Sequence, residues 1–151
     1  MDTKGLGVDH ATGPAVAGIP EGFVARRAGG PFLEPIGPLY LRRGKGPLAF
    51  GLPIEYRHSN SKDVAHGGML ATVADVFLGI GGCELAEAPG FFITISLTTD
   101  FLGPARVGSW LQCEPKLLRK TRTMMFVEGL FTADGEPALR ASGVFALPRN
   151  P

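Results

Sequence analysis

One nearly uncharged stretch in the first half of the chain constrains the fold more than any other feature. Between Val64 and Cys83, the only side chain with a formal charge is that of Asp75. An ionised carboxylate without partners in an apolar interior costs several kcal/mol, which is comparable to the whole stability of a small domain. Asp75 must therefore be hydrogen-bonded, protonated or reactive.

A membrane-spanning helix is the first interpretation of this stretch, because the segment is long enough. It is excluded by composition, since residues 64–83 contain His66, Asp75 and five glycines and are too polar and too poor in helix formers to insert. A buried helix is the better interpretation. At about 100° per residue, one face is apolar and the opposite face is small. The apolar face consists of Leu70, Val73, Phe77 and Ile80, and the small face consists of Gly68, Ala71, Thr72, Asp75, Gly79 and Gly82.

The small face allows another backbone or a thin ligand to approach the Asp75 carboxylate. An Asp75 that only hydrogen-bonds a neighbouring loop fits the pattern equally well. At the start of the helix, Gly67 and Gly68 follow His66 and leave the first backbone N–H groups uncovered. Those groups suit an anion or a developing oxyanion, because they have no partner inside the helix and lie at its positive end. A tight strand-to-helix turn is the structural alternative for the two glycines, and both interpretations can hold together.

Alternating apolar and polar residues predict strands on both sides of this helix. Residues 1–30 are rich in Gly, Ala and Pro and are expected to form a loose arm, with one helical turn possible over 21–26. Residues 31–151 are expected to form one domain. The predicted strands cover residues 39–42, 48–57 with Pro53 at an edge or bulge, 91–101, 109–118 broken by Pro115, 124–132 and 137–147. One early helix followed by an antiparallel meander predicts an α+β domain.

Composition limits the class of protein. At 151 residues and 44% hydrophobic, the chain suits one compact domain, and a formal net charge of +1 provides no field that would recruit nucleic acid or an anionic membrane. Three dispersed histidines, His10, His58 and His66, do not form a metal site. Cys83 and Cys113 are predicted to be buried free thiols. With no secretory signal at the N-terminus, they favour a cytoplasmic protein.

The spacing of two groups on the helix predicts an oligomer. Asp75 follows Gly67 by eight residues, or about 12 Å along a helix axis. An attacking group and an oxyanion donor must both lie within about 3 Å of the reacting atoms. Gly67 and Asp75 can therefore serve one site only if they come from different chains. We expect at least a twofold homodimer, and a homotetramer is also compatible with the sequence.

The combination of Asn60, His66-Gly67-Gly68 and Val73-Ala74-Asp75 at these spacings resembles the signature of the PaaI-type branch of hotdog-fold acyl-CoA thioesterases. The resemblance extends over about residues 37–147. It implies the hotdog fold, in which a curved antiparallel β-sheet wraps one long buried helix. It also implies a coenzyme A thioester as the substrate, no separate cofactor and no metal, and active sites shared between subunits.

The resemblance assigns catalytic roles to five residues. Asp75 would be the general base or the nucleophile, and the Gly67 N–H would stabilise the oxyanion. Asn60 would orient the water or the carbonyl, Thr94 would hold the nucleophilic water, and His66 would bind near the thioester or brace the loop. Each has an ordinary structural alternative, since Asn60 can cap a turn, Thr94 can be a strand residue and His66 can be structural.

Substrate binding involves Gly68 and a basic turn in the same interpretation. Arg119, Lys120 and Arg122 at this turn could meet the phosphates of coenzyme A, although a solvated hairpin explains them equally well. The predicted function is hydrolysis of an acyl- or aryl-CoA thioester. The alternatives are a hotdog protein that binds an acyl-CoA or hydrophobic ligand without cleaving it and an enoyl-CoA hydratase or dehydratase. The second alternative is suggested by the pair of Asp63 and His66.

Overall fold

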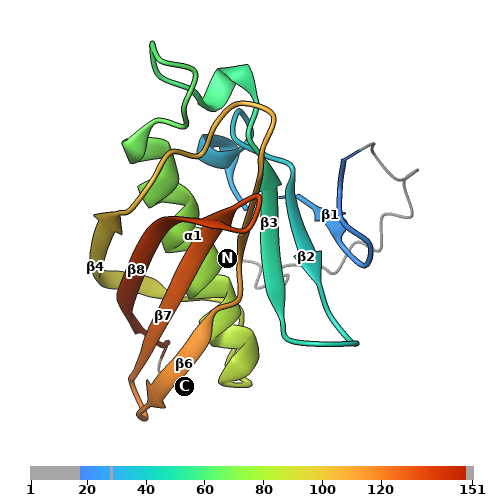
Figure 1. Ribbon diagram of the computed structural model, residues 1–151. Helices are drawn as coiled ribbons and strands as arrows, with labels where there is room; N and C mark the ends of the chain where they lie inside the picture. The colour runs from blue at the N-terminus through green and yellow to red at the C-terminus, as the bar shows by residue number, and fades with distance from the viewer. Residues whose placement is uncertain (1–17, 28, 149–151) are drawn as a thin grey trace.

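The computed structural model describes residues 18–27 and 29–148 (Figure 1). Within these residues, two short 3-10 helices, η1 and η2, accompany one long α-helix and eight strands. In chain order the elements are β1 (Val24–Arg26), η1 (Pro31–Leu33), β2 (Leu39–Arg42), β3 (Ala49–Pro53), η2 (Tyr56–His58), α1 (Gly67–Leu85), β4 (Ile93–Phe101), β5 (Trp110–Cys113), β6 (Lys116–Lys120), β7 (Met124–Ala133) and β8 (Glu136–Ala146).

All the strands belong to one antiparallel sheet, whose order is β1-β2-β3-β5-β7-β8-β4, with β6 paired to β7 beside this path. The sheet curls round α1, so that strands from both halves of the chain contact the helix (Figure 1). Pro115 separates β5 from β6, as the sequence predicts. The predicted α+β arrangement, one long helix wrapped by a curved antiparallel sheet, is confirmed.

The apolar face of α1 forms the centre of the core. Phe77 is fully buried, and its ring stacks between Phe50 of β3 and Phe131 of β7 at centroid distances of 5.1 and 6.0 Å. Truncation of such a residue to Ala typically costs about 3–5 kcal/mol. Contrary to the expectation from the sequence, composition does not exclude a membrane span, because α1 is long and apolar enough for one; however, 56% of its most apolar window is buried inside the domain. The helix therefore serves as the core of this fold.

The small face of α1 is divided into two parts. A methyl group added to Gly79 would lie 2.2 Å from the Phe92 ring, and one added to Gly82 would lie 2.6 Å from Val127, so side chains of the same chain cover these two positions. Towards the helix N-terminus the face is less covered, and Asp75 is only half-buried. The small residues near the C-terminus of α1 thus allow side chains of the same chain to pack closely, whereas the small face near the N-terminus stays open.

The structure differs from the predicted strands near the N-terminus. Residues 21–26 do not form a helical turn, because Val24–Arg26 pairs with β2 as strand β1. β3 ends at Pro53, where the proline ring removes a ladder donor, and η2 replaces the rest of the strand predicted over 48–57. Residues 1–17, 28 and 149–151 lie outside the described residues, so the loose arm predicted over residues 1–30 stays a prediction for residues 1–17, while β1 lies within residues 18–27.

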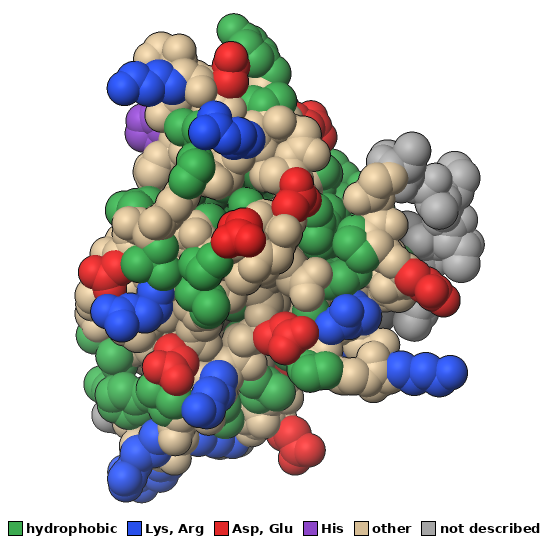
Figure 2. Space-filling model, viewed as in Figure 1, with side chains coloured by type: hydrophobic (Ala, Val, Ile, Leu, Met, Phe, Trp, Pro, Cys, Tyr) green, Lys and Arg blue, Asp and Glu red, His purple; other side chains and the backbone are tan. Residues whose placement is uncertain are grey.

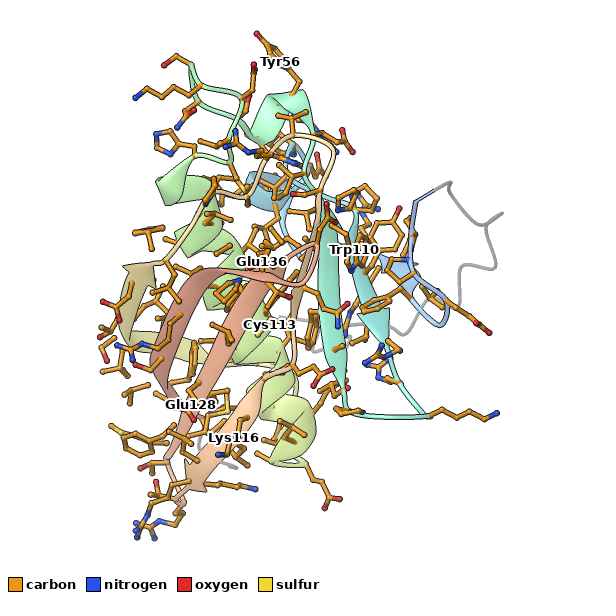
Figure 3. The ribbon with its side chains drawn as sticks, in the orientation of Figure 1. Tyr56, Trp110, Cys113, Lys116, Glu128 and Glu136 are labelled. Atoms are coloured by element: carbon orange, nitrogen blue, oxygen red, sulfur yellow. The ribbon has the colours of Figure 1, made fainter. Side chains whose placement is uncertain are left out.

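A second apolar cluster lies beside the main core and anchors β1. The rings of Phe23 and Tyr40 pack edge-on against Trp110 with centroid distances of 5.0 and 5.6 Å. Figure 3 labels Trp110, the central ring of this cluster. Phe23 directly precedes β1, while Tyr40 and Trp110 lie on β2 and β5. The cluster explains why a three-residue strand stays on the edge of the sheet.

Ion pairs connect the C-terminal end of α1 to the edge of the sheet that β1 and β2 form. Glu84 accepts hydrogen bonds from Arg26 at 3.3 Å and from the Nε of Arg43 at 2.9 Å. A carboxylate in the last turn of a helix opposes the helix dipole, and two guanidinium groups beside it offset that effect.

Candidate active site

Asp75 and Thr94 form the first part of the candidate site. The Thr94 hydroxyl donates a hydrogen bond of 2.6 Å to the Oδ1 atom of Asp75. Asp75 lies midway along α1 and Thr94 is the second residue of β4, next to a register shift between Thr94 and Ser96. The lone carboxylate of the apolar stretch is therefore hydrogen-bonded. Its contact is a strand hydroxyl, which is one of the predicted site residues.

The start of α1 leaves backbone donors free beside a cap. Four N–H groups at a helix start have no intrahelical acceptor. Here the His66 N–H donates to the His58 carbonyl at 2.8 Å, and the Gly68 N–H donates to Nδ1 of His66 at 2.9 Å. In the part of the chain that the structure describes, the N–H groups of Gly67 and Met69 have no acceptor. The helix thus presents two free N–H donors at its positive end.

His66 braces this segment through its ring, which is the structural alternative left open by the sequence. The bond to Nδ1 also occupies the Gly68 N–H, so Gly68 would contribute to substrate binding mainly through its lack of a side chain. A methyl group added to Gly67 would lie 3.4 Å from the Phe101 ring at the end of β4, which is an ordinary contact. Gly67 is therefore adjacent to the C-terminal end of β4.

Asn60 lies in the loop that leads to the helix. Its Oδ1 atom accepts a hydrogen bond of 2.8 Å from the Lys62 N–H, and its carbonyl accepts one of 3.3 Å from the Asp63 N–H. These bonds make Asn60 a turn residue. Its side-chain NH₂ group has no acceptor among the described residues, so the same side chain can still donate to a ligand.

His58 contacts the start of α1 through its carbonyl, and the sequence analysis did not predict its contacts. Its side chain is buried, with 2% exposed. Nδ1 accepts a 2.9 Å hydrogen bond from the Glu55 N–H, and Nε2 lies 2.8 Å from the Ile36 carbonyl. Because Nδ1 is an acceptor and a carbonyl can only accept, the ring is neutral with its proton on Nε2. Burial is the main cause that lowers the pKa of His58 below its usual value.

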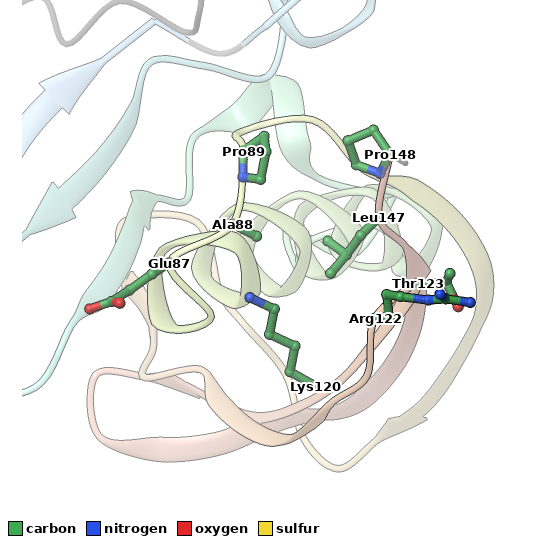
Figure 4. Close-up of a pocket in the computed structure, with 8 residues that line it drawn as sticks. All are labelled: Glu87, Ala88, Pro89, Lys120, Arg122, Thr123, Leu147 and Pro148. Carbon is green, nitrogen blue, oxygen red and sulfur yellow. The ribbon is translucent and has the colours of Figure 1, made fainter. Parts of the chain in front are cut away.

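The basic turn after β6 is partly used for structure. Lys120 and Arg122 line a pocket of about 620 Å³ at the C-terminal end of α1, together with Glu87, Ala88, Pro89, Thr123, Leu147 and Pro148 (Figure 4). The Lys120 ammonium donates a 2.8 Å hydrogen bond to the Ala86 carbonyl and so caps the helix. Arg119 is exposed on β6 and does not line this pocket.

The candidate residues form two half-sites that one chain does not bring together. Asp75 and Thr94 form the first half-site, and Gly67 with Asn60 forms the second. Eight helical residues separate Gly67 from Asp75, which corresponds to about 12 Å. The two half-sites also lie at opposite ends of β4, because Thr94 is near its start and Phe101 ends it.

Other kinds of chemistry have less support in the described residues. These contain no group of three or more His, Cys, Asp and Glu side chains that could hold a metal ion. Cys83 and Cys113 are buried free thiols, as predicted, and burial raises the pKa of Cys83 to about 11. Neither is therefore activated as a thiolate nucleophile. Acidic and basic side chains are interspersed over the face shown in Figure 2, so no single charge sign dominates it.

Comparisons with known proteins identify the family of this chain. The family profile of the Thioesterase superfamily matches residues 62–138, the span that contains α1 and most of the sheet. A Pseudomonas aeruginosa protein, PA0474, which carries the provisional name of an esterase, is 36% identical over 131 residues, covering 86% of this chain and 98% of the relative. Mouse acyl-coenzyme A thioesterase 13 is 26% identical over 76 residues, or 50% of this chain and 53% of the relative.

A solved structure gives the same result for the fold. The crystal structure of BH2602 from Bacillus halodurans with CoA matches with a TM-score of 0.61 and 25% sequence identity, covering 72% of each chain. The family match confirms the predicted resemblance to thioesterases and the predicted enzyme class. This chain, with its hotdog fold, belongs to the Thioesterase superfamily.

Proposed function

We propose that this protein is an acyl-CoA thioesterase that hydrolyses an acyl- or aryl-CoA thioester to a free acid and coenzyme A. The observation that carries the proposal is the 2.6 Å hydrogen bond between Thr94 and Asp75 on the open part of the small face of α1. A carboxylate held by a hydroxyl is suited to activate water against an ester that is already reactive. The name of the mouse relative and the CoA-bound Bacillus halodurans structure support the same substrate class.

The two half-sites meet if two chains pair along β4. Because of the extra residue at the register shift between Thr94 and Ser96, Thr94 and Phe101 are six ladder positions apart on this strand, or about 20 Å at about 3.4 Å per residue. A twofold axis at Thr98 would place Thr94 of one chain opposite the partner subunit's Phe101. Because Gly67 lies against Phe101 and Asp75 against Thr94, the same axis brings Asp75 of one chain to the partner subunit's Gly67.

The exposed surface of β4 supports this pairing. β4 is the last strand of the sheet, and no described residue pairs with its outer edge. Its apolar side chains stay open to solvent in one chain, with Ile93, Ile95 and Phe101 exposed by 57%, 55% and 55%. A nine-residue open edge with apolar side chains is a surface that proteins normally cover. A second copy of this chain would cover it and complete two active sites.

In the proposed reaction, a water bound by Asp75 and Thr94 attacks the thioester carbonyl carbon. Its proton passes to the Asp75 carboxylate, and the carbonyl oxygen becomes an oxyanion that accepts a hydrogen bond from the partner subunit's Gly67 N–H. The side-chain NH₂ of the partner subunit's Asn60 can donate to the same oxygen. Collapse of the intermediate breaks the C–S bond, and the coenzyme A thiolate takes up the proton that Asp75 received.

The pocket at the end of α1 is a suitable place for the coenzyme A phosphates. Ala86 follows Asp75 by eleven residues, or about 16 Å along the helix axis. The pantetheine arm has thirteen bonds from sulfur to phosphorus, which span about 15 Å at the rise of an extended peptide. Arg122 and Lys120 line the pocket at that distance, although Glu87 lies at its rim. We therefore place the phosphates near Arg122 and not near Arg119.

Thiol release from a panel of short, medium, long and aryl acyl-CoAs tests the function. We expect release by the wild type, and a fall of about 10²–10⁴-fold in kcat for Asp75→Asn, the range for loss of a general base. The asparagine keeps an Oδ1 acceptor for Thr94, so fold and assembly should be unchanged. An Asp75→Asn variant with full turnover would remove Asp75 from the proposed role.

The binding-protein alternative makes the opposite prediction. Calorimetry would then show tight acyl-CoA binding by a folded dimer, while no thioester of the panel releases coenzyme A. Hydration of an enoyl-CoA, measured by loss of its conjugated absorbance, tests the hydratase alternative in the same samples.

A further inference from the structure

We propose that His58 is a positioning residue that holds the oxyanion donor of Gly67 in place. It is not expected to touch the substrate, because its side chain is buried with 2% exposed. The inference rests on the proposed function, since it assigns His58 a role in the same reaction.

The chain of contacts from His58 to Gly67 is short. The His58 carbonyl accepts a 2.8 Å hydrogen bond from the His66 N–H, and the His66 ring in turn accepts the Gly68 N–H at 2.9 Å. Together these two bonds fix the residues on either side of Gly67. The direction of the Gly67 N–H is therefore set by where the His58 backbone lies.

The His58 ring fixes that backbone from two sides. Its Nδ1 accepts the Glu55 N–H and closes a reciprocal cap on η2, in which the Glu55 side chain also bonds the His58 backbone. Its Nε2 donates to the Ile36 carbonyl in the turn after η1. One buried ring thus joins two segments that lie far apart in sequence.

Only a neutral ring can make both contacts. Nδ1 must be unprotonated to accept and Nε2 must be protonated to donate. The charged side chains that face His58 are those of Glu55 and Arg57, which favour opposite protonation states of the ring. The Arg57 guanidinium itself donates to the Gly37 carbonyl at 2.6 Å, so it reinforces the same link between η2 and the turn after η1.

A positioning role predicts a specific kinetic pattern. An oxyanion donor acts in the transition state and hardly in the bound substrate, so its displacement should lower kcat and leave KM almost unchanged. A small misplacement of a catalytic group can cost up to about 100-fold in rate. For His58→Leu, which keeps the volume and removes both ring hydrogen bonds, we expect kcat to fall about 10- to 100-fold with KM within about twofold.

Two further variants separate positioning from general stability. His58→Gln supplies the acceptor that commonly closes such a cap, so it should restore part of the lost kcat. Val127→Ala removes buried volume from β7, far from the loop, and serves as the destabilised control. All proteins are compared as folded oligomers below their melting temperatures. Val127→Ala should melt at a lower temperature than wild type and keep its kcat.

A double-mutant cycle tests whether His58 acts through Gly67. Gly67→Pro removes the N–H at the first helical position, where proline is tolerated. If His58 acts by placing that N–H, adding His58→Leu to Gly67→Pro should lower kcat by less than about twofold more. If the fold-losses in kcat of the two single variants multiply in the double variant, the proposal is overturned. It would also be overturned if His58→Leu kept its kcat, or if neither His58 variant folded while Val127→Ala did. A wild type without thioesterase activity would instead refute the proposed function.

Discussion

The replacement of Gly67 by proline removes one hydrogen-bond donor from the candidate site and changes little else. Gly67 is the first residue of α1, where a proline fits because the N–H has no intrahelical acceptor. The preceding residue, His66, has φ −64° and ψ 134°, which is the extended conformation that a following proline requires. Gly67→Ala is the matched control, because its methyl group would meet the Phe101 ring at an ordinary 3.4 Å and its N–H is retained.

The size of the effect follows from the number of donors that remain. Loss of one oxyanion-hole donor lowers kcat by about 10²–10³-fold in well-studied hydrolases. In this protein the Met69 N–H and the Asn60 side-chain NH₂ also lack acceptors among the described residues, and either can partly replace Gly67. We therefore expect the lower end of the range, about 100-fold or about 2.7 kcal/mol of transition-state stabilisation.

The measurement is kcat and KM for the best thioester of the acyl-CoA panel, together with thermal melting of each variant. We expect Gly67→Pro to lose kcat, to keep KM and to melt near the wild-type temperature. Equal kcat values for Gly67→Pro and wild type would show that Gly67 is not the donor. An equal loss in Gly67→Ala and Gly67→Pro would point to crowding of the site and would also refute the reasoning.

Four further predictions address the interface, the nucleotide, pH and the thiols. Ile95→Lys on the open edge of β4 should shift the protein to monomers in light scattering and abolish turnover, because each site needs two chains; an active monomer would contradict the shared site. Arg122→Ala should raise KM for acyl-CoA about tenfold, the loss of one charge-assisted hydrogen bond, and leave KM for an acyl-pantetheine thioester unchanged. The pKa of His58 is lowered in the folded state, so below about pH 6.5 the unfolded chain takes up the proton more readily than the folded protein, and the free energy of unfolding should fall. Urea unfolding at pH 7.5 and 5.5 should show this loss, and His58→Gln should reduce it. Cys83 and Cys113 should not react with a disulfide reagent until the protein unfolds, so two thiols should titrate only in denaturant.

The parts of the fold that follow from local pattern were predictable from the sequence. The lone carboxylate was predicted to be hydrogen-bonded, protonated or reactive, and Thr94 donates a hydrogen bond to it. Alternating residues predicted β7, in which buried and less buried positions alternate along the strand. The glycines after His66 predicted free N–H donors at the start of the helix, and the Gly67 and Met69 N–H groups have no acceptor among the described residues. In each case residues close together in the sequence determine the local structure.

Contacts between distant segments were not predictable in the same way. Gly79 and Gly82 belong to the small face by periodicity, but whether a ligand or the same chain covers them depends on where Phe92 and Val127 arrive in space. The contacts of His58 were missed for the same reason. Its partner Ile36 is 22 residues away, and a lone histidine in a loop gives no signal of burial.

The division of the small face explains what its small residues are for. Near the C-terminus of α1 they admit Phe92 and Val127 of the same chain, so they contribute to folding. Near the N-terminus of α1, the proposed dimer places Asp75 of one chain beside the partner subunit's Gly67. The twofold axis then passes close to Ala71, which lies midway between positions 67 and 75. A larger side chain at this position would meet its own copy and move both pairs of half-sites apart at once. The spacing of the two helices is then one distance that sets the geometry of both active sites.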